Sequence, residues 1–181
     1  MALSGTLSGK LNRCILLAFC VLLAYAPLAA AQAAPAKPHA PAVGKPAPVF
    51  ARPALDGGRV DLAALRGKVV LLDFWATWCA PCQAEMPTFA NWQRQYAVQG
   101  LQVVGVSMDD DAAPVRRLAA RLKINYPMVM GDEKLGAQYG GILGLPLIYV
   151  IGRDGVVRAR FQGETDSAKI LAALRPLLAQ R

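Results

Sequence analysis

A seven-residue apolar run that leads into a pair of cysteines constrains this chain more than any other feature. The run is VVLLDFW, from Val69 to Trp75, and the pair is Cys79-Ala-Pro-Cys82. An apolar run without alternation is typical of a central strand covered on both faces of a sheet. The cysteines therefore follow the carboxyl end of a buried strand, where the chemistry of α/β folds collects.

The residues that follow predict an amphipathic helix. One apolar stripe recurs at helical spacing and the helix ends at Gly100. Its members are Glu85, Phe89, Trp92 and Tyr96. Pro81 suits the first turn, where a missing N–H costs nothing. Cys79 is then at the helix N-terminus, where free N–H groups and the helix dipole stabilise a thiolate, and Cys82 is one turn inside.

The rest of the pattern predicts an α/β fold, with a central mixed β-sheet, helices on both faces and an N-terminal β-hairpin. Further strands are expected at 49–51, 59–62, 101–108, 127–130, 147–151 and 156–161, and further helices at 112–123, 133–139 and 167–180. The first two strands flank LDGG, a turn sequence typical of a hairpin.

The N-terminal segment predicts export. Residues 1–31 carry Lys10 and Arg13 and no acid ahead of a continuous apolar run that ends in small residues, as in a signal peptide. An uncleaved membrane anchor is the alternative. Residues 32–48 contain five prolines and predict a linker or tether, which leaves 49–181 as the folded domain. The expected location is periplasmic or otherwise extracytoplasmic.

The counts of cysteine and histidine narrow the chemistry of the pair. Of four cysteines, Cys14 and Cys20 lie in the apolar leader, and the one histidine, His39, lies in the linker. A closed copper or zinc site needs three or four ligands, so we expect no metal and no other cofactor. Haem attachment would need histidine where Gln83 stands. A purely structural disulfide would close too small a loop to constrain the unfolded chain.

The net charge of +8 indicates a solvated basic surface. An exported chain is not expected to meet nucleic acid. Mild attraction to acidic partners or to anionic lipid is the minority interpretation.

Thiol–disulfide exchange is the chemistry that these positions favour. Cys79 would attack a partner's disulfide, and Cys82 would resolve the mixed disulfide. Cys82 must lose a proton, and two acids are candidate acceptors: Asp73 within the apolar strand and Glu85 on the helix stripe. The alternative is that both acids are satisfied by backbone groups or water.

The stretch DFWATWCAPCQAEMP resembles the active site of thioredoxin-fold proteins. Together with the leader, the hairpin and Glu85, it is similar to the TlpA/ResA-like thiol:disulfide oxidoreductases, over residues 44–161. The resemblance implies that Cys79 and Cys82 are the attacking and resolving thiols. It matches Asp73 to the buried acid of thioredoxins, where many TlpA-like proteins carry asparagine, and Pro87 to the proline that kinks the active-site helix.

The same resemblance predicts a substrate-docking surface. Pro146 matches the cis-proline that lies against the cysteines, and Trp78, Pro81 and Leu145 complete the surface. Leu145 departs from the valine or threonine of many relatives, which would bear on the choice of partner.

The resemblance further implies reduction of protein disulfides outside the cytoplasm. Electrons would come from a membrane thiol transporter, often to keep cysteines of apocytochrome c or of copper sites reduced. A disulfide oxidase or isomerase is the main alternative. A thioredoxin-like peroxidase, a metal carrier and a non-catalytic interaction domain are further alternatives.

Overall fold

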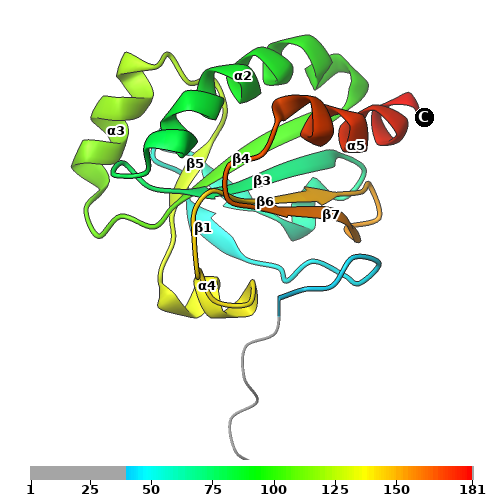
Figure 1. Ribbon diagram of the computed structural model, residues 1–181, viewed down its shortest axis with the longest axis horizontal. Helices are drawn as coiled ribbons and strands as arrows, with labels where there is room; N and C mark the ends of the chain where they lie inside the picture. Colours follow the sequence, from blue (N-terminus) through cyan, green and yellow to red (C-terminus); the bar gives the residue numbers. More distant parts are fainter. Residues whose placement is uncertain (1–39, 181) are drawn as a thin grey trace, which may run out of the picture. The chain divides into compact units, whose positions relative to one another are not determined.

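A five-stranded mixed sheet forms the centre of the fold (Figure 1). The computed structural model describes residues 40–180. Its strands are β3 (Val69–Trp75), β4 (Leu101–Ser107), β5 (Met128–Met130), β6 (Leu147–Ile151) and β7 (Val157–Gln162), in the order β5-β4-β3-β6-β7. β3, β4 and β5 run parallel, and β6 and β7 are antiparallel to their neighbours. The predicted mixed sheet is confirmed.

Helices cover both faces of this sheet. α2 (Ala80–Tyr96), α3 (Ala112–Arg121) and α5 (Ser167–Ala179) pack on one face, and α4 (Glu133–Gln138) lies on the other with the N-terminal segment (Figure 1). All seven residues of β3 are buried, as a strand between two apolar layers must be. β3 therefore carries side chains into two separate cores.

Three of the helices begin at an aspartate. The carboxylates of Asp111, Asp132 and Asp166 accept backbone N–H groups at the N-termini of α3, α4 and α5. Such caps satisfy donors that have no partner within the helix. α2 differs, because its N-cap residue is Cys79. It ends through a short 3-10 turn, η2 (Ala97–Gln99), at Gly100, whose φ of 92° is left-handed.

The predicted hairpin forms, but its first strand lies later in the sequence than expected. β1 (Ala51–Pro53) pairs with β2 (Arg59–Asp61), so the first strand begins two residues later than the expected 49–51. The reason is the tight turn, in which Ala54 N–H donates to Gly58 O at 2.8 Å and carries pairing up to Pro53. A 3-10 turn, η1 (Ala63–Leu65), follows.

Ordered contacts begin before residue 49. Gly44 N–H donates to Val157 O at 2.8 Å, and Val157 N–H donates to Lys45 O at 2.9 Å. Ala47 is buried and its N–H donates to Gly155 O. The end of the proline-rich stretch thus lies against the β6–β7 turn. The expected leader at 1–31 lies outside the described residues, and the division into leader, linker and domain stays a prediction.

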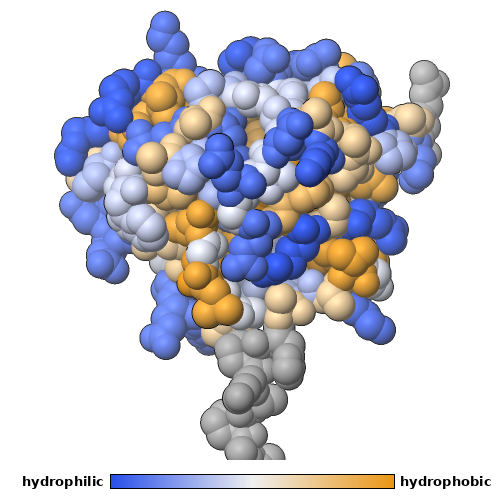
Figure 2. Space-filling model, in the orientation of Figure 1, coloured by the Kyte–Doolittle hydropathy of each residue, from blue (hydrophilic) through white to orange (hydrophobic). Residues whose placement is uncertain are grey.

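The face seen in Figure 2 is mixed, with hydrophilic side chains interspersed with apolar patches. Within residues 40–180, no helix is both long and apolar enough to cross a membrane.

Candidate active site

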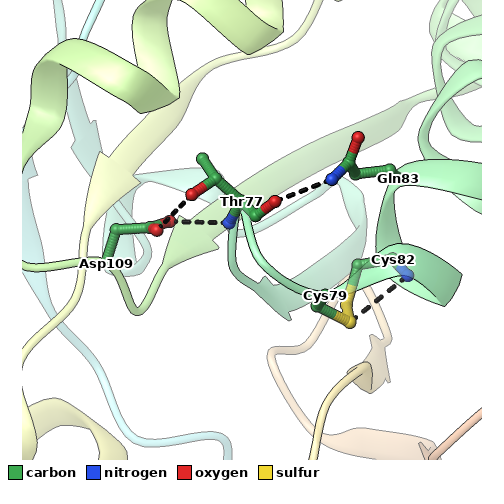
Figure 3. Close-up of a disulfide and its surroundings, with 5 residues drawn as sticks. All are labelled: Thr77, Cys79, Cys82, Gln83 and Asp109. Atoms are coloured by element: carbon green, nitrogen blue, oxygen red, sulfur yellow. Dashed lines mark hydrogen bonds between the residues drawn. A yellow bond between two sulfur atoms is a disulfide. The ribbon is translucent and has the colours of Figure 1, made fainter.

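A disulfide joins the two cysteines at the N-terminus of α2 (Figure 3). The S–S distance is 2.08 Å and the Cα atoms of Cys79 and Cys82 are 5.3 Å apart. Cys79 has extended backbone angles and its Sγ accepts the N–H of Cys82 at 3.3 Å. Pro81 lies in the first turn. The predicted helix start is confirmed, and the sulfur of Cys79 occupies the position that aspartate oxygens take in the other helices.

The two cysteines are covered to different degrees. Cys79 retains 4% of its accessible surface and Cys82 none, so the expected shielding of Cys82 is present. Cys79 is itself almost fully covered, although it stands at a helix end. Trp78, directly before it in the sequence, is 71% exposed. A large apolar side chain therefore stands in solvent next to the cysteine pair in the sequence.

The Leu145–Pro146 peptide bond is cis, as the resemblance predicted. Pro146 is buried directly before β6, and its carbonyl accepts the N–H of Gly163 at 2.8 Å. Leu145 is half-buried and packs against the core cluster that contains both cysteines. Its docking role stays a prediction.

Asp73 is completely buried in the middle of β3. Neither carboxylate oxygen has a hydrogen-bond partner among the described residues. Burial raises the pKa of Asp73 well above its ordinary value, and the nearby charge of Glu85 raises it further. A carboxyl group in this environment holds a proton that aqueous aspartate would release.

Glu85 is half-buried on α2, one turn beyond Cys82. Its Oε1 atom is inaccessible to solvent and has no partner in the described part of the chain. Burial, followed by the charge of Glu164, raises the pKa of Glu85 to about 7. The core face of α2 is formed by Cys82, Met86, Phe89, Ala90 and Trp92, which places Glu85 at the border of the expected stripe. At that border it can exchange protons near neutral pH.

Two further polar groups that the sequence did not point to lie beside Asp73. Over residues 40–180, Trp75 Nε1 and the Tyr126 hydroxyl are likewise buried without a partner. Asp73 pairs in register with Gly105, where an added Cβ would meet Trp75 Nε1 at 3.1 Å and Tyr126 Cε2 at 3.5 Å. Gly105 thus makes room for both rings. A glycine inside an apolar strand was the one available signal of such close packing.

We refer to Asp73, Trp75, Glu85 and Tyr126 as the buried polar cluster. Burial raises the pKa of Tyr126 well above its ordinary value, with the charges of Asp73 and Glu85 adding to the effect. Tyr126 therefore keeps its proton, and the cluster combines two donors, the indole N–H and the phenol O–H, with two carboxyl groups.

A second polar network holds the loop before Cys79 (Figure 3). The Asp109 carboxylate accepts the N–H of Thr77 at 2.9 Å and its hydroxyl at 2.6 Å. Gln83 Nε2 donates to Thr77 O at 2.7 Å. Asp109 lies beyond the end of β4, and no local motif identified it.

Among residues 40–180 there is no group of three or more histidine, cysteine, aspartate or glutamate side chains placed to hold a metal ion.

Known proteins resemble this chain in sequence and in fold. The model of the AhpC/TSA family matches residues 43–160. The thiol-disulfide oxidoreductase ResA of Geobacillus thermodenitrificans is 31% identical over 138 residues, which cover 75% of this chain and 79% of that protein. The thioredoxin-like protein YneN of Bacillus subtilis is 35% identical over 118 residues, or 64% and 68% of the two chains.

A solved structure shares the fold. The crystal structure of a thiol:disulfide interchange protein from Chlorobium tepidum superposes with a TM-score of 0.69 at 30% identity, covering 77% of this chain and all of that one. Fold and site together define a thiol:disulfide oxidoreductase with a thioredoxin-like fold. The chain belongs to the AhpC/TSA family and, within it, to the ResA-like thiol:disulfide oxidoreductases, which confirms the resemblance.

Proposed function

We propose that this oxidoreductase reduces disulfide bonds of exported proteins through Cys79 and Cys82. The observation that supports it most is a disulfide whose first sulfur caps α2, the helix that also carries Glu85. The cap favours a thiolate at Cys79 in the reduced protein, because the N–H of Cys82 and the helix dipole stabilise negative charge there.

Exchange proceeds in two steps that conserve electrons. The Cys79 thiolate attacks one sulfur of the substrate disulfide, forming a mixed disulfide and releasing the other sulfur as a thiolate. The Cys82 thiolate then attacks Cys79 Sγ, and the second substrate sulfur leaves. The substrate gains two electrons and takes up two protons, and the protein is left with the Cys79–Cys82 disulfide.

The second step needs a base near Cys82, which is fully buried in the disulfide form. Glu85 is the first candidate, since it is one turn away and its pKa is about 7. Asp73 is the second candidate, since its raised pKa makes it a stronger base than an ordinary aspartate whenever it is ionised. Trp78, Pro81, Leu145 and Pro146 would dock the substrate chain beside Cys79.

The proposed electron supply and location are supported by the predicted leader and by the family resemblance. A signal peptide or anchor at residues 1–31 would place the domain outside the cytoplasm, in the periplasm or its equivalent, tethered if uncleaved. A membrane thiol transporter would then reduce the Cys79–Cys82 disulfide after each cycle. Apocytochrome c or copper-site cysteines are the substrates we favour.

Two variants test the proposal. Cys79→Ser should abolish reduction of insulin or of a test peptide, whereas Cys82→Ala should accumulate the mixed disulfide, whose partner mass spectrometry would identify. Wild-type reduction by the Cys79→Ser protein would overturn the assignment. Recovery of small thiols alone would contradict a dedicated protein substrate.

The reduction potential of the Cys79–Cys82 pair decides between the reductase and the oxidase or isomerase alternative. A reduction potential well above the poise of the compartment would favour it, and one below that poise supports the reductase. Consumption of hydrogen peroxide that depends on Cys79 would favour the peroxidase alternative.

A further inference from the structure

The loop that precedes Cys79 is held by a carboxylate from the loop that follows the neighbouring strand, β4. β3 and β4 are parallel and Trp75 pairs with Ser107, so the two loops that follow them leave the sheet side by side. Asp109 stands on the second loop and faces Thr77 on the first (Figure 3). Both carboxylate oxygens are used, one on each donor of Thr77.

Two residues of this network flank the cysteine pair in the sequence. Thr77 lies two residues before Cys79, and Gln83, which donates to Thr77 O, lies directly after Cys82 (Figure 3). Backbone bonds continue the restraint, because Cys79 N–H donates to Ala76 O at 3.1 Å and Gln83 N–H donates to Cys79 O at 3.1 Å. Every polar group of Thr77 is therefore committed, and the loop has little freedom to move away from α2.

Asp109 is itself fixed. The hydroxyl of the fully buried Ser107 donates to its carboxylate at 2.7 Å, and Asp109 N–H donates back to that hydroxyl at 3.1 Å. Asp110, the next residue, is exposed. Asp109 thus bonds to the active-site loop, whereas its neighbour Asp110 is exposed to solvent. Substitution of Asp110 is therefore a matched control for substitution of Asp109.

A restrained loop changes the balance between dithiol and disulfide. The equilibrium depends on the effective concentration of one thiol at the other, which rises when both are already held within bonding reach. A loop free to move in the reduced protein would lose that freedom on closing the bond. Restraint therefore favours the disulfide, and a protein that favours its own disulfide is the stronger reductant.

We propose that Asp109 is a positioning residue that acts through Thr77 to hold Cys79 and Cys82 in disulfide-forming geometry, which lowers the reduction potential of the pair. This rests on the proposed function in taking the pair to be redox-active. It makes no use of the identity of the substrate.

The test is an equilibrium with glutathione. Full-length Asp109→Ala, Thr77→Val, Asp110→Ala and wild-type proteins are equilibrated with graded ratios of reduced to oxidised glutathione. Free thiols are then alkylated and counted by mass spectrometry. Asp109→Ala should shift the equilibrium constant toward the dithiol by about three- to tenfold, where tenfold is about 30 mV for a two-electron couple. Thr77→Val, which removes one of the two donors, should shift it less in the same direction, and Asp110→Ala should not shift it.

A second measurement separates positioning from ordinary stabilisation. The urea midpoint of each protein is measured with the pair oxidised and with it reduced. Positioning requires Asp109→Ala to destabilise the oxidised form more than the reduced form. Equal destabilisation of both forms, or an unchanged glutathione equilibrium in a folded variant, would overturn the inference.

The two proposals fail differently. If Cys79→Ser reduces insulin normally, the proposed function is wrong whatever Asp109 does. If Cys79→Ser is inactive and the Asp109→Ala equilibrium matches that of wild type, only the positioning role is wrong.

Discussion

The two faces of the central sheet treat their buried polar groups differently. On the face with α4, the Tyr139 hydroxyl donates to Pro48 O at 2.7 Å and the Tyr149 hydroxyl to Tyr139 O at 2.9 Å. Arg160 Nε donates to the Tyr149 hydroxyl at 3.1 Å. Both tyrosine rings pack around Phe74, with ring centroids 4.9 and 6.3 Å away. On the face with α2, the buried polar cluster has no such partners within residues 40–180.

The contrast arises within a single strand. Side chains alternate along β3, so Phe74 enters the aromatic core while Asp73 and Trp75 enter the core beneath the cysteines. Burying a polar group without a partner costs about 1–3 kcal/mol, and more if it is charged. The buried tyrosine hydroxyls on the α4 face have partners and so do not incur this cost. The buried polar cluster on the α2 face does incur it. Under the proposed function, the unpartnered carboxyl groups on the α2 face would serve proton transfer rather than stability.

Substitution of Glu85, the proposed base on the α2 face, should have the largest effect, and this effect is on the rate of the resolving step. Glu85 accepts a proton only when ionised, so the rate of the resolving step should rise with pH through a midpoint near 7. Glu85→Gln should remove that rise and lower the rate at pH 8 by about tenfold to a hundredfold, with little change at pH 5.5. Stopped-flow measurement of mixed-disulfide decay checks this. Glu164→Gln is the control, since removing its charge should move the midpoint to lower pH.

Neutralising the buried aspartate should stabilise the fold. Asp73 holds its proton more tightly folded than unfolded, so its contribution to stability falls as pH rises from near 3.8 through its raised folded-state pKa. Asp73→Asn should therefore increase the free energy of unfolding by about 1–3 kcal/mol at pH 8. The gain should vanish near pH 3.5. Urea unfolding at the two pH values measures both, and a gain that persists in acid would contradict this origin.

Removal of a satisfied hydroxyl on the α4 face should have the opposite sign. Tyr139→Phe leaves the Pro48 carbonyl without its donor and should cost about 1 kcal/mol of stability. Glutathione equilibrium and exchange rate should stay at wild-type values. A changed redox equilibrium would show that the two faces are coupled.

Removal of the hydroxyl on the α2 face should not destabilise the fold. Tyr126 has no partner in the described structure to lose, so Tyr126→Phe removes an unpaired buried group and should raise the free energy of unfolding slightly, by up to about 1 kcal/mol. The pair Tyr139→Phe and Tyr126→Phe makes the same chemical change on opposite faces. Equal losses from both would remove the distinction between the faces.

Local pattern was enough to predict much of this molecule. The apolar run of β3, the proline in the first turn of α2 and the positions of the other helices are properties of short segments. The cis bond before Pro146 came from resemblance, because no local rule distinguishes it from a trans bond. The first strand of the hairpin was placed two residues too early, since its pairing continues through Pro53 up to the LDGG turn.

Contacts between distant segments could not be predicted. Thr77 and Asp109 are 32 residues apart in sequence and meet only because β3 and β4 pair in parallel at one register. Tyr126 lies in a connection before β5, where nothing in the local sequence marks it as a core group. Its place beside Asp73 depends on the missing side chain of Gly105. Such positions follow from strand register, which a single sequence specifies poorly.

The outer strands of the sheet are poor partners for another extended chain. Ala54 and Leu55 bond to β5, and Gly44 and Lys45 bond to the start of β7. The remainder of β7 carries two charged side chains, Arg158 and Arg160, which disfavour pairing with another strand. An oxidoreductase proposed to meet unfolded polypeptides risks binding them along any open strand edge. Under the proposed function, occupied edges would leave the loops around Cys79 as the place where an unfolded substrate meets the protein, without being retained as an added strand.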